Sequence, residues 1–140
     1  MQQHILFVCT SCESAHRTKQ AVRVSGGQRL LEQLRSQHND SLLQEELSIQ
    51  PVECLSACEQ PCAIALIATD KPTYLYGNLP IEAEQLETTA SSILAFAKQY
   101  HAKADGSISY LKCPELLKKR VLAKIPPLPG NVSHMENCLM

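Results

Sequence analysis

Val52-Glu-Cys54-Leu-Ser-Ala-Cys58-Glu-Gln-Pro-Cys62 leads directly into the apolar run Ala63-Ile-Ala-Leu-Ile-Ala68. A continuous apolar run of this length is typical of a strand that is buried on both faces of a sheet. The residues just before the cysteines, Ser48 to Val52, predict another strand. Proline has no amide donor, so Pro51 is expected at a strand end or an edge. The stretch therefore predicts a cysteine-dense loop between two strands.

The neighbouring segments supply partners for these strands. His4–Val8 is a short apolar run that predicts a first strand, and Thr73–Tyr76 predicts a strand that forms a hairpin with Ala63–Ala68. A helix is expected to open at Ser25-Gly-Gly, with Ser25 as its cap, and a longer amphipathic helix from about Pro80 to about Tyr100. Because a strand–helix–strand unit makes its two strands parallel, this order predicts an α/β protein with a small mixed four-stranded sheet and two main helices.

The C-terminal part of the chain is expected to be an extension of the same domain. Asp105-Gly106 interrupts the helical pattern, so we divide the chain into residues 1–106, the main domain, and residues 107–140, an extension packed on it. Pro114–Ala123 predicts a short helix, and Ile125-Pro-Pro-Leu-Pro-Gly130 predicts an extended segment. A chain of 140 residues fits one domain.

Composition and charge exclude several classes of protein. Hydrophobic residues make up 44% of the chain, which is enough for a core. Thirteen Lys and Arg against fourteen Asp and Glu leave a net charge of −1, without the basic excess of a general nucleic-acid binder. No apolar run approaches the roughly 18 residues of a membrane span, and the first residues lack the features of a signal peptide. We expect a cytoplasmic protein that binds neither nucleic acid nor a membrane.

Cysteine is the unusual residue of this chain. There are seven, an odd number, so they cannot all pair within the chain. Cys9 and Cys12 follow the first predicted strand, and Cys54, Cys58 and Cys62 follow the second. The carboxyl ends of parallel neighbouring strands meet at one edge of a sheet, so the two groups are expected to converge. Convergent thiolates need a cation, which a zinc ion or an iron–sulfur cluster supplies. This interpretation requires Cys9 and Cys54 to meet at the same edge.

The run from Val52 to Pro61 is followed by an apolar strand, a Tyr-bearing strand and a long helix. This order resembles the thioredoxin-like 2Fe–2S ferredoxins and the corresponding domain of the small respiratory complex I subunit. Closer still, the chain resembles an uncharacterised bacterial family of predicted metal-binding, cysteine-rich thioredoxin-like ferredoxin proteins. The motifs that carry this resemblance are Val8 to Cys12, Glu53 to Cys62 and Ala123 to Leu128, and it covers about residues 4–129.

The resemblance implies a thioredoxin-like fold and a 2Fe–2S cluster that serves one-electron transfer. It implies no enzyme activity of its own, a reductase and an acceptor enzyme as redox partners, and a possible homodimer. By position, Cys9, Cys54 and Cys58 match cluster ligands of the ferredoxins. Their remaining ligand lies near the start of the first helix, where this chain has no cysteine, so Cys12 is the natural substitute. Cys62 is an alternative ligand or a buried core thiol.

Two other functions remain open from the residues alone. The first is a zinc-binding protein or metal carrier with four cysteine ligands and no redox role. The second is a thiol–disulfide oxidoreductase that uses Cys9 and Cys12. The loop-like run after Cys12 argues against the second, because a reactive thiolate of that class normally sits at a helix N-terminus.

Overall fold

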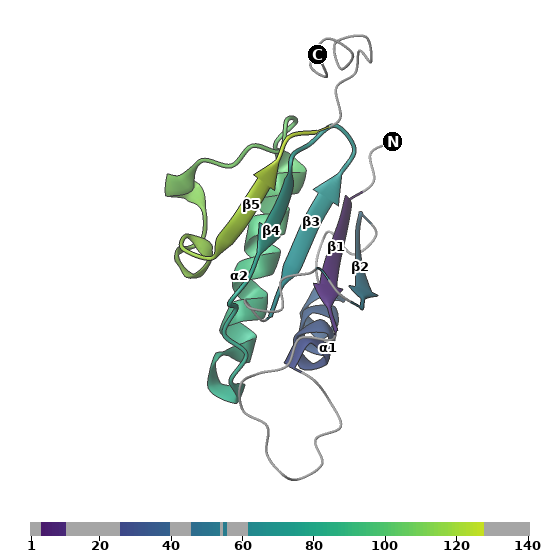
Figure 1. The fold of residues 1–140 in the computed structure, drawn as a ribbon, viewed down its shortest axis with the longest axis vertical. Helices are drawn as coiled ribbons and strands as arrows, with labels where there is room; N and C mark the ends of the chain where they lie inside the picture. Colours follow the sequence, from purple (N-terminus) through teal and green to yellow (C-terminus); the bar gives the residue numbers. More distant parts are fainter. Residues whose placement is uncertain (1–3, 11–25, 40–45, 54, 56–61, 128–140) are drawn as a thin grey trace.

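The computed structural model describes residues 4–10, 26–39, 46–53, 55 and 62–127. Among these residues, five strands form one sheet in the order β2-β1-β3-β4-β5 (Figure 1). The elements in chain order are β1 (His4–Cys9), α1 (Gly26–His38), β2 (Leu47–Val52), β3 (Ile64–Ala68), β4 (Thr73–Tyr76), α2 (Ala83–Ala102), the 3-10 turns η1 (Tyr110–Lys112) and η2 (Glu115–Leu117), and β5 (Val121–Ile125).

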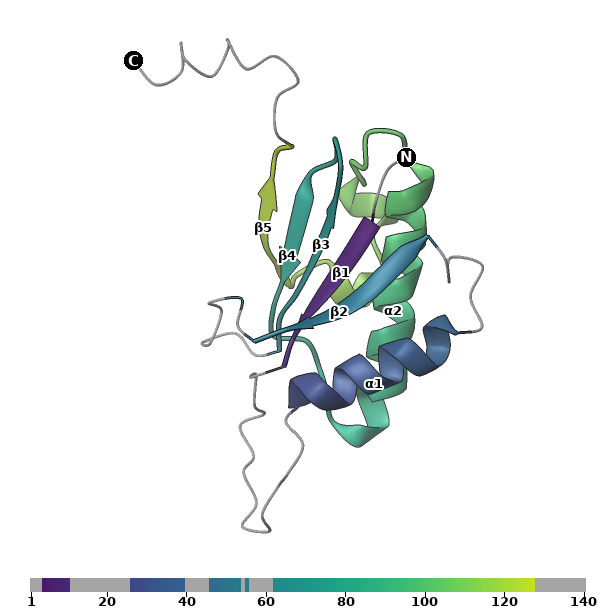
Figure 2. The ribbon, with the colours of Figure 1, turned by 90° about the vertical axis from the view of Figure 1, so that its right-hand side faces the viewer.

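The topology confirms the predicted fold. β1 pairs in parallel with β2 and antiparallel with β3, and β3 pairs antiparallel with β4. This is the strand arrangement of the thioredoxin-like fold. Figures 1 and 2 both place α1 and α2 on the same face of the sheet. None of the helices in the described part of the chain combines the length and the hydrophobicity needed to cross a membrane.

The C-terminal part differs from the prediction, because it adds a fifth strand. β5 pairs antiparallel with β4, with Thr73 opposite Ile125 and Leu75 opposite Ala123. The helix predicted over Pro114–Ala123 is wrong: only the short turn η2 forms there. Without β5, β4 would be an edge strand with unpaired backbone groups, and the branched residues at both ends of β5 suit a strand. The division of the chain at residue 106 stays a prediction.

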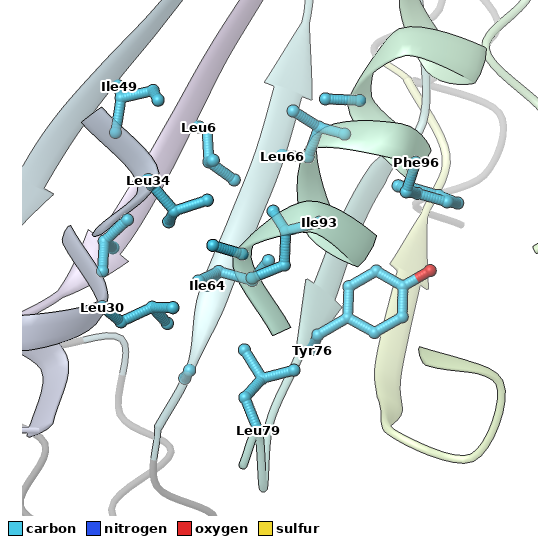
Figure 3. Close-up of a cluster of buried hydrophobic side chains, with 14 of the residues drawn as sticks. Leu6, Leu30, Leu34, Ile49, Ile64, Leu66, Tyr76, Leu79, Ile93 and Phe96 are labelled. Atoms are coloured by element: carbon cyan, nitrogen blue, oxygen red, sulfur yellow. The ribbon is translucent and has the colours of Figure 1, made fainter. Parts of the chain in front are cut away.

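The core lies between the sheet and the two helices. Alternate residues of β1, Leu6 and Val8, are fully buried under α1 and α2 together with Leu30 and Leu34 of α1. Figure 3 shows the same layer continuing through Ile64, Leu66, Ile93 and Phe96. β3 is not buried on both faces as predicted, because Ile67 is 38% exposed. The predicted cap Ser25 lies outside the described residues.

A buried lysine closes the end of the core near the start of β1. Lys71 is 1% exposed, and its ammonium donates hydrogen bonds to the carbonyl oxygens of Tyr100 (2.8 Å) and His101 (3.2 Å). These carbonyls belong to the last turn of α2, where a cation is favoured by the helix dipole. The third partner is Nε2 of His4, at 2.9 Å. Gly106, at φ +68°, packs over the lysine stem, so that a Cβ there would lie 2.7 Å from Lys71 Cβ.

The contact between His4 and Lys71 predicts a pH-dependent stability. The pKa of His4 is lowered from 6.5 to about 4. Burial is the largest cause, followed by the nearby positive charges of Lys71 and His101, and Glu46 has a smaller opposing effect. Between these two pH values the unfolded chain binds a proton on residue 4 that the folded chain does not. The free energy of unfolding should therefore fall as the pH drops from about 6.5 to about 4, by up to about 3 kcal/mol.

The measurement is urea unfolding at a series of pH values for the wild type and for His4→Gln. Glutamine keeps an acceptor for Lys71 but does not titrate, so the variant should lose most of this slope. Equal slopes in the two proteins would contradict the assignment to His4.

Candidate metal centre

Three strand ends meet at the carboxyl edge of β1. Cys9, the last residue of β1, stands opposite Val52, the last residue of β2. The Cys9 amide donates to the carbonyl oxygen of Ala63, just before β3, over 3.1 Å. The Thr10 amide donates to the carbonyl oxygen of Val52 over 2.9 Å. These hydrogen bonds join the ends of β1 and β2 and the entry to β3 in one place.

The side chain of Cys9 lies beside the segment that leads to the central cysteines. Its Sγ is 3.7 Å from the carbonyl oxygen of Glu53, and the residue is only 3% exposed. Glu53 immediately precedes Cys54 in the chain, and Leu55 packs against the hydrophobic core. The two chain segments that the sequence analysis expected to converge thus meet at one edge of the sheet.

Cys62 lies at the same edge and is fully buried. Its carbonyl oxygen accepts a hydrogen bond from the Leu79 amide over 3.3 Å, and its Sγ lies 3.3 Å from the position that a Cβ on Gly26 would occupy. The sulfur therefore packs against the first turn of α1. The first turn of α1 contains no acidic residue, and the positive end of its dipole favours negative charge on a nearby sulfur.

The candidate ligands divide into those that the structure places and those that it does not describe. Cys9 and the alternative ligand Cys62 are placed at the carboxyl edge, whereas Cys12, Cys54 and Cys58 lie outside the described residues. Within the described ranges, no group of three or more His, Cys, Asp or Glu side chains could hold a metal ion. The ligand set therefore stays a prediction.

Two glycines allow α1 to approach this edge, a role that the sequence analysis missed. A Cβ on Gly27 would lie 1.9 Å from the carbonyl oxygen of Cys9, and a Cβ on Gly26 would lie 2.2 Å from Cδ1 of Ile81. The contact of Gly27 is with backbone, which only a residue without a side chain permits, whereas that of Gly26 is with the end of a side chain. The signal was present in the sequence, since adjacent glycines at a helix start are typical of a close approach as well as of a helix opening.

Cys113 lies elsewhere in the molecule. Its Sγ is 3.9 Å from the hydroxyl of Tyr76, and burial, the largest effect, raises the pKa of its thiol. It is half-buried next to the turn η2 and follows η1 directly. Its contact is with β4, which β3 separates from β1, so it supplies a control position for experiments on the other cysteines.

These observations define a thioredoxin-like fold with Cys9 and Cys62 at the carboxyl edge of its first strand. The chain belongs to the family described as "Protein of unknown function (DUF1636)", whose model matches residues 6–127. No curated protein matches the chain.

Two solved structures of thioredoxin-like [2Fe-2S] ferredoxins from Aquifex aeolicus are similar to this chain. The wild-type protein at 1.5 Å resolution is 17% identical, with a TM-score of 0.49, over 87% of this chain and 98% of that chain. The other structure is 19% identical, with a TM-score of 0.47, over 92% of this chain and 97% of that chain.

The contacts of the two glycines predict unequal effects of alanine. Gly27→Ala places a methyl group against the backbone of Cys9, which cannot move without disturbing β1, and should lower the free energy of unfolding by about 3 kcal/mol or more. Gly26→Ala meets mainly the end of the flexible Ile81 side chain and should cost less than half as much. Urea unfolding of both variants measures this difference. Equal costs would contradict the backbone approach of α1 to Cys9.

Proposed function

We propose that this protein is a 2Fe–2S ferredoxin-like one-electron carrier. The cluster is held by four cysteines from two chain segments: Cys9, Cys12, Cys54 and Cys58. The observation that carries the proposal is the 3.7 Å contact between Cys9 Sγ and the carbonyl oxygen of Glu53, which brings the cysteine of β1 beside the residue that precedes Cys54.

The donor set suits such a cluster. Thiolates are the ordinary ligands of a 2Fe–2S cluster, and five cysteines are available from the two segments. When bound, the cluster supplies reversible one-electron chemistry, as its iron changes between the ferric and the mixed-valence form. The chain's own residues set its surroundings: Val8, Leu79 and Ile81 are buried near this edge and make it apolar. Such an apolar shell influences the reduction potential of a metal site.

The burial of Cys9 weighs against the oxidoreductase alternative. Reactive thiols of that class are partly exposed so that they can attack a disulfide, whereas Cys9 is 3% exposed. A carrier that docks with a reductase and an acceptor enzyme needs no access to the sulfur itself, since an electron moves without atomic contact between the two centres. The same four thiolates could hold zinc, and the metal content separates these two functions.

The first test is the composition of the protein after anaerobic purification. A 2Fe–2S cluster predicts a red-brown protein with about two iron ions and two acid-labile sulfides per chain, and an EPR signal that arises on reduction. Colourless protein with one zinc ion per chain and no sulfide would contradict the electron-carrier function and support the zinc-binding function instead.

Serine substitutions then test the ligands one by one. Cys9→Ser, Cys54→Ser and Cys58→Ser should each lose most of the iron and sulfide, because serine is a poor substitute for a thiolate ligand. Cys113→Ser is the matched control and should keep a full cluster.

The fourth ligand is tested by comparing Cys12→Ser with Cys62→Ser. We expect the first variant to lose the cluster and the second to keep it, because Cys62 is packed in the core. The reverse result would make Cys62 the ligand in place of Cys12.

A further inference from the structure

The face of the sheet opposite α1 and α2 is apolar and, among the described residues, has no element packed on it. In β1 the alternation that buries Leu6 and Val8 turns Ile5 and Phe7 to the opposite face. The pairing of β1 with β3 continues this row of apolar residues onto β3, because Ile5 stands opposite Ile67 and Phe7 opposite Ala65. We call this surface the open face; its larger members are Ile5, Phe7, Ile67, Leu75 and Ile125.

The open face is partly accessible, since Ile5, Phe7 and Leu75 are half-buried, and its strand positions carry no charge. Ile67 is 38% exposed and Ile125 is 51% exposed. β2 contributes the uncharged Ser48 and Gln50, which stand opposite Ile5 and Phe7. The one charged residue of β5, Lys124, belongs to the other face: its Nζ donates to Ser107 Oγ over 3.0 Å and lies 5.6 Å from the centre of the Tyr74 ring. A partner for this face must therefore be apolar.

The candidate metal centre lies at one end of the open face. Cys9 follows Ile5 and Phe7 in the same alternation along β1, and two residues of strand span about 7 Å. A protein seated on the open face would thus be close to the ligand on which the proposed cluster depends. No other apolar surface of the described strands has this relation to Cys9, since their opposite face is covered by the helices.

The size of the open face favours a brief encounter over a permanent one. Five strands about 4.8 Å apart, with four to six residues each, cover about 400 Å². An interface of this size buries about 800 Å² over both partners. Stable dimers need about 1,200–2,000 Å², whereas weak electron-transfer complexes fall below about 1,200 Å². The area therefore argues against a second copy of this chain and for a transient redox partner.

We infer that the open face is the docking surface for the redox partner of this protein, and that the partner presents a small, apolar, uncharged patch. This inference rests on the proposed function. Contact along Phe7, Ile67 and Leu75 would hold the partner beside the carboxyl edge without salt bridges, so the association should depend little on ionic strength.

The test uses a gold electrode covered with a methyl-terminated alkanethiol monolayer as an apolar probe. Full-length, cluster-loaded protein is applied, and both the adsorbed mass and the rate of electron transfer to the electrode are measured. Ile67→Glu places a charge in the open face and should lower adsorption affinity and transfer rate at least tenfold. Leu111→Glu is the matched control, because Leu111 is 83% exposed but lies in η1 outside the sheet, and it should stay within twofold of the wild type.

Each other outcome overturns the inference in a recognisable way. Equal adsorption of the wild type and Ile67→Glu means that the open face makes no contact with the probe. Failure of the wild type itself to adsorb means that other residues of the chain cover the face. A wild type that sediments as a dimer, with Ile67→Glu as a monomer, makes a second copy the occupant. Protein without iron and sulfide overturns the proposed function, even where adsorption still depends on Ile67.

Discussion

The parallel pairing of β1 with β2 is the interaction on which the candidate site depends. It sets Cys9 opposite Val52, so that the turn after β2 begins beside the cysteine that ends β1. A shift of one residue in this register would turn one of the two strands over relative to the other, so that Cys9 and the end of β2 would no longer lie on the same face. The hydrogen bond from the Thr10 amide to Val52 holds this register at the place where the site begins, and the one from the Cys9 amide to Ala63 joins β1 to the entry of β3.

The two ends of the sheet place different groups against the helix termini. At the carboxyl edge, glycines let the start of α1 approach the backbone of Cys9, so that the positive end of a helix dipole lies near sulfur. At the opposite end, the buried ammonium of Lys71 binds the last carbonyls of α2. The end of α2 therefore meets a cation, and the start of α1 meets a sulfur atom on which its dipole would favour negative charge. α1 and α2 both lie on one face of the sheet, and among the described residues no element packs on the other, apolar face.

Local patterns predicted most of the core elements because each strand or helix carries its own periodicity. The apolar runs at His4–Val8 and Ala63–Ala68 and the leucines of α1 all lie in elements close to those expected. The pattern was insufficient for Val121–Ile125, where the residues before it favour a helix and the two branched residues at its ends are too weak a signal for a strand. β5 forms because β4 offers an open edge 45 residues or more away in the chain, a contact that no local window contains.

For the site, the spacing of the cysteines after two predicted strands was enough to expect their convergence at one edge, because parallel neighbouring strands end together. The sequence left open whether Cys62 is a ligand or a buried thiol, and the paired glycines indicated a close approach without identifying the Cys9 carbonyl as its partner. Both depend on how α1 packs over the strand ends, which is a matter of distances between elements. Composition and periodicity thus specified the layers and the direction of the strands. Packing alone established which atoms meet, because contacts across layers join residues that share no local pattern.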